Sequence, residues 1–199
     1  MSGKEPMKEP RPGVKLTCDD FLLFPDDGLR HELIDGEHYA TPSPVSNHQR
    51  IVGNLHWLIR SFLEEHPVGE VFVAPFDVVL SQFDIVVPDL LYISNERARE
   101  VMTDANVRGT PELVIEVGSP GTRKRDETIK LRLYERVAVL EYWIVDPKRD
   151  VIRMYRRADD SFRPAVQLSL EVRDVLTTPL LPGLELPLTA VFKSHQAIT

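Results

Sequence analysis

Apolar residues recur at helical spacing in one long segment, residues 46–65. The apolar positions there are Ile51, Val52, Leu55, Leu58, Ile59, Phe62 and Leu63. Residues three or four apart lie on the same side of an α-helix, so these positions form one apolar face. Ser46 and Gln49 fit a capping box at the start, and Pro67 and Gly69 supply a stop. The pattern predicts a helix over 46–65 with one face in the core.

After residue 70 the pattern changes to short apolar runs typical of strands. The runs cover residues 71–74, 76–80, 85–93, 111–117, 139–145, 151–157 and 162–168. Pro88 interrupts the third run, and because proline lacks a backbone N–H it predicts a break there. Helical character returns over 95–102 and 123–137. The pattern predicts a sheet, with helical segments between some of its strands.

The start of the chain predicts a tail, a short helix and a hairpin. Residues 1–15 are rich in Pro, Lys and Glu with little to bury, which predicts a flexible tail. Thr17 to Asp20 has the form of a helix start, and Asp35-Gly36 suits a tight turn between two β-type runs. With 199 residues and 42% hydrophobic content, the remainder, 16–199, is expected to form a single domain.

Two of the predicted strands carry a carboxylate that an ordinary buried strand would avoid. Asp89 follows Pro88, and Glu116 lies in the run 111–117. An ionised acid in apolar surroundings is costly unless it is paired or binds a cation. Two carboxylates on adjacent strand ends offer a hard divalent cation the oxygen ligands it prefers. We therefore predict a site for Mg²⁺ (or Mn²⁺) at Asp89 and Glu116, a site suited to phosphodiester hydrolysis.

The helix that follows the Glu116 strand supplies a candidate cation. Asp126, Lys130 and Tyr134 recur at i, i+4 spacing and share a face. A lysine beside the metal would offset charge that grows on phosphate in the transition state, which is the role expected of Lys130. The alternative is an exposed pair with Asp126, worth only about 0.3–0.5 kcal/mol.

Several motifs together resemble one bacterial family, the Uma-type restriction endonucleases. They are Glu32 to Glu37, Pro88 to Leu91, Pro111 to Val117 and Glu141 to Pro147. The resemblance covers nearly the whole chain from Thr17 to Phe192. It implies an α/β (α+β) restriction-endonuclease-like fold of the PD-(D/E)XK nuclease superfamily. That fold has a central mixed β-sheet flanked by helices, here with an N-terminal helix and β-hairpin.

The resemblance also implies roles for individual residues. Asp89 resembles the superfamily's aspartate and Glu116 its second acid, and both are expected to hold metal. Two positions after Glu116 the superfamily has lysine, whereas this chain has Gly118. Related proteins supply the cation from the following helix, which makes Lys130 the expected substitute. Glu32 is an additional catalytic candidate, with a surface-paired hairpin residue as the alternative.

Three further residues are candidates for contact with the substrate. His48 lies in the first helical turn of 46–65, where helix N–H groups favour anions, and a solvated turn is the alternative. Arg123 begins a basic helix start that could meet phosphate, although such runs are more often solvated faces. Tyr134 could stack on a base, although aromatic residues at this spacing more often belong to the core.

Charge and cysteine content narrow the class of protein. Twenty-four Lys and Arg against 31 Asp and Glu give a net charge of −7, which argues against a protein that coats nucleic acid by charge alone. The single cysteine, Cys18, excludes an internal disulfide framework and indicates a reducing compartment. No apolar run approaches the roughly 18 residues of a membrane span. We expect a cytoplasmic protein without membrane contact.

Two hypotheses from different classes follow. The first is a Mg²⁺-dependent endonuclease acting on DNA, as a homodimer because duplex cleavage usually needs two sites. The second is a catalytically inactive module on the same fold that binds nucleic acid or a protein partner, as Gly118 and the acidic charge would allow. The direction of the Lys130 side chain distinguishes them: an enzyme needs it beside Asp89 and Glu116.

Overall fold

The computed structural model describes residues 14–119 and 121–194. Its central sheet has seven strands, with the order β11-β10-β9-β8-β6-β3 and β12 paired to β10. The strands are β3 (Gly69–Val73), β6 (Leu90–Ser94), β8 (Leu113–Val117), β9 (Glu141–Asp146), β10 (Val151–Ala158), β11 (Ser161–Phe162) and β12 (Val166–Ser169). Strands β8 and β9 are parallel and the other pairs are antiparallel. The predicted mixed sheet is confirmed.

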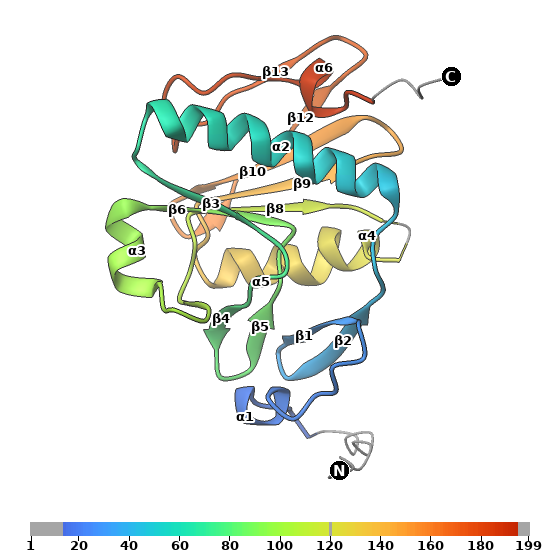
Figure 1. Cartoon of the computed structure of the whole chain (residues 1–199), viewed down its shortest axis with the longest axis vertical. Coiled ribbons are helices and arrows are strands. Elements are labelled where there is room, and N and C mark those ends of the chain that lie inside the picture. Colours follow the sequence, from blue (N-terminus) through green and yellow to red (C-terminus); the bar gives the residue numbers. More distant parts are fainter. Residues whose placement is uncertain (1–13, 120, 195–199) are drawn as a thin grey trace.

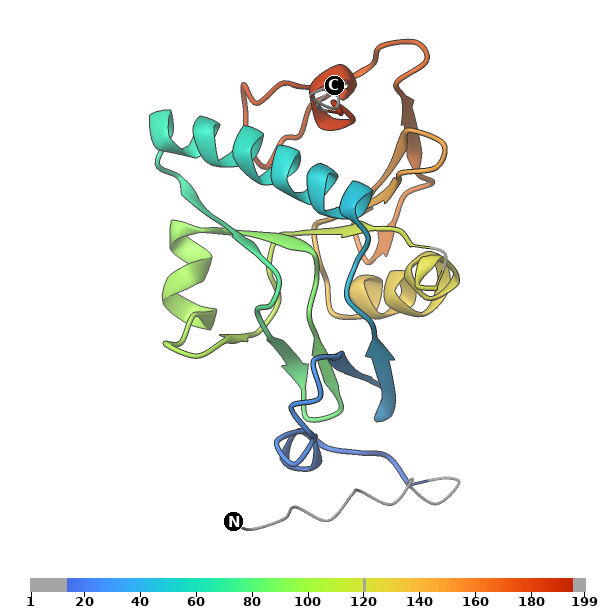
Figure 2. The ribbon, with the colours of Figure 1, turned by 45° about the vertical axis from the view of Figure 1, so that its right-hand side comes forward.

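Helices cover both faces of this sheet (Figures 1 and 2). On one face lies α2 (Ser46–Glu65), together with α6 (Leu188–Val191) and the strands β13 (Val175–Leu176) and β14 (Leu186–Pro187). On the other face lie α3 (Asn95–Val101) and one continuous helix. That helix consists of α4 (Arg123–Arg125), the π-helical turn η1 (Asp126–Lys130) and α5 (Leu131–Arg136). Strand β8 is buried along its whole length between these layers.

A second sheet lies beside the first, at the bottom of Figure 1. Its order is β2-β1-β5-β4-β7. The strands are β1 (Arg30–Ile34), β2 (Glu37–Thr41), β4 (Val78–Ser81), β5 (Asp84–Val86) and β7 (Val107–Arg108), and α1 (Cys18–Phe21) lies at the end of this sheet. The predicted hairpin is confirmed: Asp35 and Gly36 have φ of 53° and 75°, the left-handed region that a tight β-turn requires.

Pro88 marks the point where the chain passes from one sheet to the other. It follows β5 of the second sheet and precedes β6 of the central sheet, so the predicted break is confirmed. Asp89 therefore sits at the junction of the two sheets. In the register of β6 against β8, Leu90 pairs with Ile115, which places Asp89 close to Glu116 on the neighbouring strand. Two acids 27 positions apart are thus neighbours because two strands pair.

Some sequence predictions differ from the structure. The capping box at Ser46 and Gln49 is wrong, because Val45 precedes the first turn and no side chain caps it. The run 162–168 forms two short strands rather than one. Most of the tail predicted over 1–15 falls outside the described residues, and the division into a tail and one domain stays a prediction. No helix within 14–119 or 121–194 is both long and apolar enough to cross a membrane.

Candidate active site

Four acidic side chains from separate segments converge under a cavity of about 260 Å³, which we call the acid cavity. Glu32 comes from β1, Asp89 from the residue before β6, Glu116 from β8 and Asp126 from η1. None is more than 4% exposed. Three cationic side chains also line the cavity: Arg30, Arg125 and Lys130. Burying this much charge costs several kcal/mol per ion unless the groups satisfy one another, so the contacts within the cluster decide what it can do.

Lys130 lies inside the acidic cluster. Its side chain is 3% exposed, and Nζ lies 2.7 Å from Glu116 Oε1 and 2.7 Å from Glu32 Oε1. Burial alone would lower the pKa of Lys130, but the Glu116 and Glu32 carboxylates outweigh it and raise the pKa above its ordinary value. The ammonium therefore keeps its proton. The alternative of an exposed surface pair does not apply to this residue.

Glu116 uses one oxygen for the protein and leaves the other free. Oε1 accepts hydrogen bonds from Lys130 Nζ and, at 3.0 Å, from the Tyr134 hydroxyl. Within the described chain Oε2 accepts none. Burial raises the pKa of Glu116 to about 8 against the pull of Lys130, and the nearby Asp89 carboxylate adds to the rise. The free oxygen of this carboxylate is available to a further cation.

Both carboxylate oxygens of Asp89 have hydrogen-bond partners within the protein. Arg30 Nη1 lies 2.8 Å from Oδ1, His48 Nε2 lies 3.0 Å from Oδ2, and the Val117 N–H donates to Oδ2 at 2.8 Å. Burial would raise the pKa of Asp89, but the His48 hydrogen bond and the Arg30 charge outweigh it and lower the pKa to about 2. Asp89 is thus ionised throughout the physiological range.

Glu32 and Asp126 complete the acidic set. Besides Lys130, Glu32 accepts a hydrogen bond from the Val87 N–H at 3.0 Å and pairs with Arg125 at 3.4 Å. Its pKa is lowered because Lys130 outweighs the effect of burial. Asp126 differs, because burial raises its pKa and its Oδ1 is buried without a partner in the described part of the chain. Glu32 belongs to the cluster rather than to a surface pair.

The donor set fits a hard divalent cation. Four acids face three permanent cations. Asp126 Oδ1 is buried without a partner, and the hydrogen bonds of Glu116 go to Oε1 and leave Oε2 free among the described residues. Both are carboxylate oxygens of the kind that Mg²⁺ and Mn²⁺ prefer. Among residues 14–119 and 121–194, no three acidic, histidine or cysteine side chains are already arranged as a metal site. Asp89 would join Glu116 as a ligand by exchanging a bond to Arg30 or His48.

A protein-family model matches most of this chain. The model of the Uma2 family, described as "Putative restriction endonuclease", matches residues 18–189. The chain belongs to this family. An uncharacterised protein of Synechocystis sp., slr1290, is 27% identical over 154 residues, which cover 75% of this chain and 78% of that protein.

A solved structure also has the fold of this Uma2 chain. It is the crystal structure of a "putative nuclease belonging to DUF820" from Anabaena variabilis, with a TM-score of 0.75 and 19% identity. The match covers 89% of this chain and 97% of that one. The restriction-endonuclease-like fold that the Uma-type motifs implied is thereby confirmed.

The three residues of this Uma2 chain that were predicted to contact substrate have different surroundings. His48 is 5% exposed and bonds Asp89, so it does not form a solvated turn. The Tyr134 ring is fully buried and packs edge-on to Tyr142, which matches the core alternative rather than stacking on a base. Arg123 pairs with Glu127 at 2.7 Å and lines a neighbouring hollow rather than the acid cavity.

Arg30 and the unpaired oxygen of Asp126 were not predicted as parts of the site, and Arg125 was predicted only as one of the basic residues at the helix start that could contact phosphate. One signal for Arg30 is its position two residues before Glu32, which puts both side chains on the same side of a strand. Arg125 directly precedes Asp126 in a basic run that looks like a solvated face. The π-helical turn at 126–130 also has no signature in the apolar spacing, and such turns are frequent at functional sites.

Removing the Arg30 charge is expected to destabilise this Uma2 protein. Arg30→Met leaves the buried Asp89 carboxylate with only His48 and one backbone donor, so the free energy of unfolding should fall by about 1–3 kcal/mol. Arg60→Met is the control, because Arg60 and Glu64 form an exposed pair whose loss should cost less than about 0.5 kcal/mol. Urea denaturation of both variants at pH 7 measures the difference. Equal losses would mean that Arg30 does not support Asp89.

Proposed function

We propose that this protein is a divalent-metal-dependent endonuclease that hydrolyses phosphodiester bonds in DNA. The observation that carries the proposal is the buried Lys130 ammonium, 2.7 Å from Glu116 and in the same cavity as Asp89. Burying ionised groups beside one another costs stability, and clusters of this kind with perturbed pKa values concentrate at catalytic sites. A module that only binds a partner gains nothing from this arrangement.

Each residue of the cavity has a role in this proposal. Asp89 and Glu116 hold Mg²⁺ or Mn²⁺, which when bound polarises the scissile phosphate and lowers the pKa of the attacking water. Lys130 keeps its proton on Nζ and offsets the negative charge that grows on the phosphate oxygens. Glu32 holds the ammonium from the other side, so that it stays directed at Glu116.

Two further residues prepare the site for substrate. Arg30 and His48 keep Asp89 ionised and line the cavity where a phosphate would enter. Lys130 also substitutes for the lysine that the superfamily has at the position of Gly118. It reaches the same acid from the helix, across 14 positions of sequence. The positive charge beside Glu116 thus comes from the helix instead of from the strand that carries Glu116.

Cleavage assays test the proposal. Supercoiled plasmid and single-stranded DNA are incubated with wild type, Asp89→Asn, Glu116→Gln and Lys130→Met in Mg²⁺, Mn²⁺ or EDTA. We expect cleavage by wild type with metal only, and a loss of roughly 10²–10³-fold in each variant, which is the usual effect of removing one charge-stabilising group. Asp104→Asn, an exposed acid outside the cavity, is the control and should cleave like wild type.

The outcomes separate the two hypotheses. Cleavage that survives all three substitutions would show that the activity comes from another site or another protein. Absence of cleavage on every substrate would favour the inactive module, for which the specific observation is that Arg30 and His48 already occupy both oxygens of Asp89.

The assembly and the compartment form part of the same proposal. Cutting both strands of a duplex takes two sites, so we propose a homodimer of cytoplasmic chains, for which the lone Cys18 and the acidic net charge give no obstacle. Light scattering with and without a DNA duplex measures the mass of the assembly. A chain that stays monomeric on duplex would instead cut single strands or nick.

A further inference from the structure

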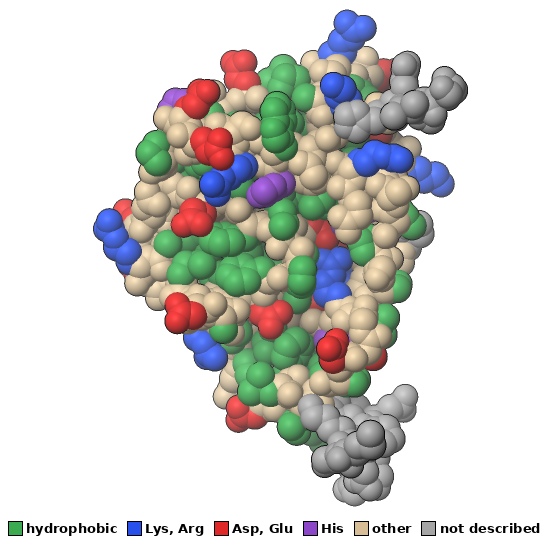
Figure 3. Space-filling model, viewed as in Figure 1, with side chains coloured by type: hydrophobic (Ala, Val, Ile, Leu, Met, Phe, Trp, Pro, Cys, Tyr) green, Lys and Arg blue, Asp and Glu red, His purple; other side chains and the backbone are tan. Residues whose placement is uncertain are grey.

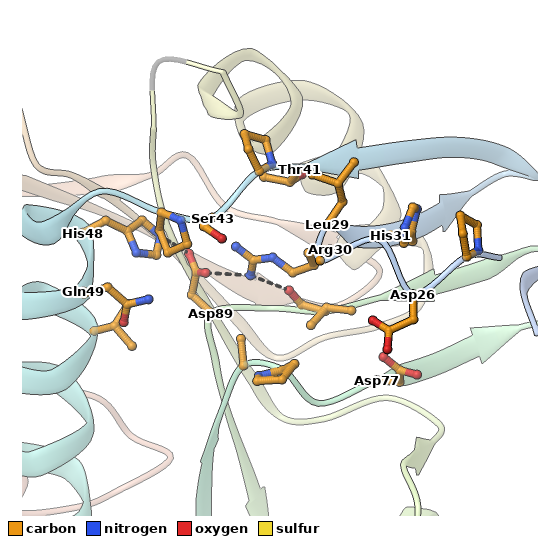
Figure 4. A pocket seen from close by; sticks show the side chains of 18 of the residues that line it. Asp26, Leu29, Arg30, His31, Thr41, Ser43, His48, Gln49, Asp77 and Asp89 are labelled. Atoms are coloured by element: carbon orange, nitrogen blue, oxygen red, sulfur yellow. Dashed lines mark hydrogen bonds and ion pairs between the residues drawn. The ribbon is translucent and has the colours of Figure 1, made fainter.

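A second cavity of about 510 Å³ opens beside the acid cavity (Figure 4). Arg30, His48 and Asp89 line both cavities, so the second one begins where the proposed catalytic site ends. The connector from β2 to α2, residues 41–44, also borders both. A substrate whose phosphate lies at Lys130 would therefore place a neighbouring group in this second cavity, which we call the side pocket.

The walls of the side pocket are mostly apolar. The apolar lining residues include Phe21, Pro25, Leu29, Pro44, Val52 and Pro75. Pockets of a few hundred Å³ with apolar walls and few polar groups are typical small-molecule sites. Flat apolar and aromatic side chains can pack against the flat face of any nucleobase.

The side pocket has charged side chains at both ends. Arg30 and His48 lie at the end next to Asp89, and Asp26 and Asp77 lie at the other end in Figure 4. The side chains of Asp26 and Asp77 make no hydrogen bond or ion pair with any described residue. Burial raises the pKa of Asp77 because no donor compensates it. His48 Nδ1 is likewise buried without a partner among the described atoms. The end with Asp26 and Asp77 therefore suits N–H donors of a ligand.

We propose that the side pocket binds the nucleoside next to the scissile phosphate, and that Asp77 recognises its base, with guanine preferred. The inference rests on the proposed nuclease function. Guanine presents two adjacent donors, N1–H and the N2 amino group, to which a carboxylate can bind with both oxygens. Thymine presents a single N–H, and the carbonyl oxygens on either side of it repel a carboxylate. Asp26 at the same end adds acceptors of the same kind.

Nucleotide binding without metal tests this assignment. Calorimetric titration in EDTA compares dGMP, dIMP and dTMP on wild type, on Asp77→Asn and on the exposed control Asp104→Asn. We expect wild type to bind dGMP roughly tenfold more tightly than dTMP, as the loss of a charged hydrogen bond implies. The analogue dIMP lacks the N2 amino group and should fall between them. Asp77→Asn should lose the preference, and Asp104→Asn should keep it.

The design separates failure of this inference from failure of the nuclease. Equal binding of dGMP and dTMP by wild type overturns the inference, and so does absence of dGMP binding; neither result needs a variant that folds. A guanine preference that survives in Asp77→Asn overturns the role of Asp77. EDTA prevents metal-dependent cleavage, so a preference that depends on Asp77 supports the pocket even if no DNA is cut. Conversely, metal-dependent cleavage by a protein with no base preference supports the nuclease and overturns the inference.

Discussion

Lys130→Met is expected to lower the free energy of unfolding at pH 8.5 by about 3–5 kcal/mol, the usual cost of removing one member of a buried ion pair. Methionine fills the volume of the lysine stem but leaves the Glu32 and Glu116 carboxylates buried together without the ammonium that joins them. The loss should shrink as pH falls from 8.5 to 5, because Glu116, whose pKa is about 8, takes up a proton over this range. Urea denaturation at the two pH values measures both effects.

A double-mutant cycle with Glu116→Gln assigns the cause. If Lys130 and Glu116 stabilise each other, the double variant should be more stable than the sum of the two single changes in free energy predicts, with a coupling of about 1–3 kcal/mol. Arg60→Met with Glu64→Gln is the matched exposed pair, with little coupling expected. Additive losses in the buried pair would show that Lys130 supports the fold by packing alone.

The stability of the metal-free protein is expected to fall as pH rises from about 5 to 8. Burial raises the pKa of Glu116 from 4.5 to about 8, so the folded protein holds a proton that the unfolded chain releases above pH 4.5. This contribution to stability is complete below pH 4.5 and is lost as pH rises through 8. The fall should amount to roughly 3–5 kcal/mol. Thermal unfolding in EDTA across this range measures it.

The comparison variant isolates the carboxyl group responsible. Glu116→Gln cannot titrate, so its stability should change much less between pH 5 and 8, and at pH 8 it should match or exceed wild type. Asp89 cannot produce the fall, because its pKa is lowered to about 2 and its stabilisation is lost only at acid pH. A wild-type curve that is flat or rises over this range would contradict the burial of an ionisable Glu116.

Local pattern was sufficient to predict the catalytic candidates. Asp89 and Glu116 conflict with the apolar strands that carry them, and this conflict remains visible without a structure. The helix with Lys130 follows the Glu116 strand directly, so a short connection predicted that the two would meet. The family motifs then gave the fold, because several of them fall at the same elements in order along the chain.

The partners of these residues could not be predicted in the same way. Arg30 reaches Asp89 because a hairpin of the second sheet packs beside the central sheet, a contact across 59 positions that no periodicity encodes. The spacing of Asp126 and Lys130 suggested an exposed pair, whereas packing against Glu32 and Glu116 buries both. Arg123 was expected near phosphate, and Glu127 and Asp146 hold it elsewhere.

The capacity of the acid cavity to bind one catalytic cation is tested most directly by Mn²⁺ titration of the intact protein with cleavage measured on the same samples. Electron paramagnetic resonance at pH 8 counts bound Mn²⁺ on wild type, Glu116→Gln and the control Asp104→Asn. We predict Mn²⁺ binding and DNA cleavage that rise together in wild type and in the control, with both lost in Glu116→Gln. Cleavage by Glu116→Gln at the wild-type rate, or wild-type protein that binds no Mn²⁺ and still cleaves, would contradict the assignment of this cavity as the nuclease active site.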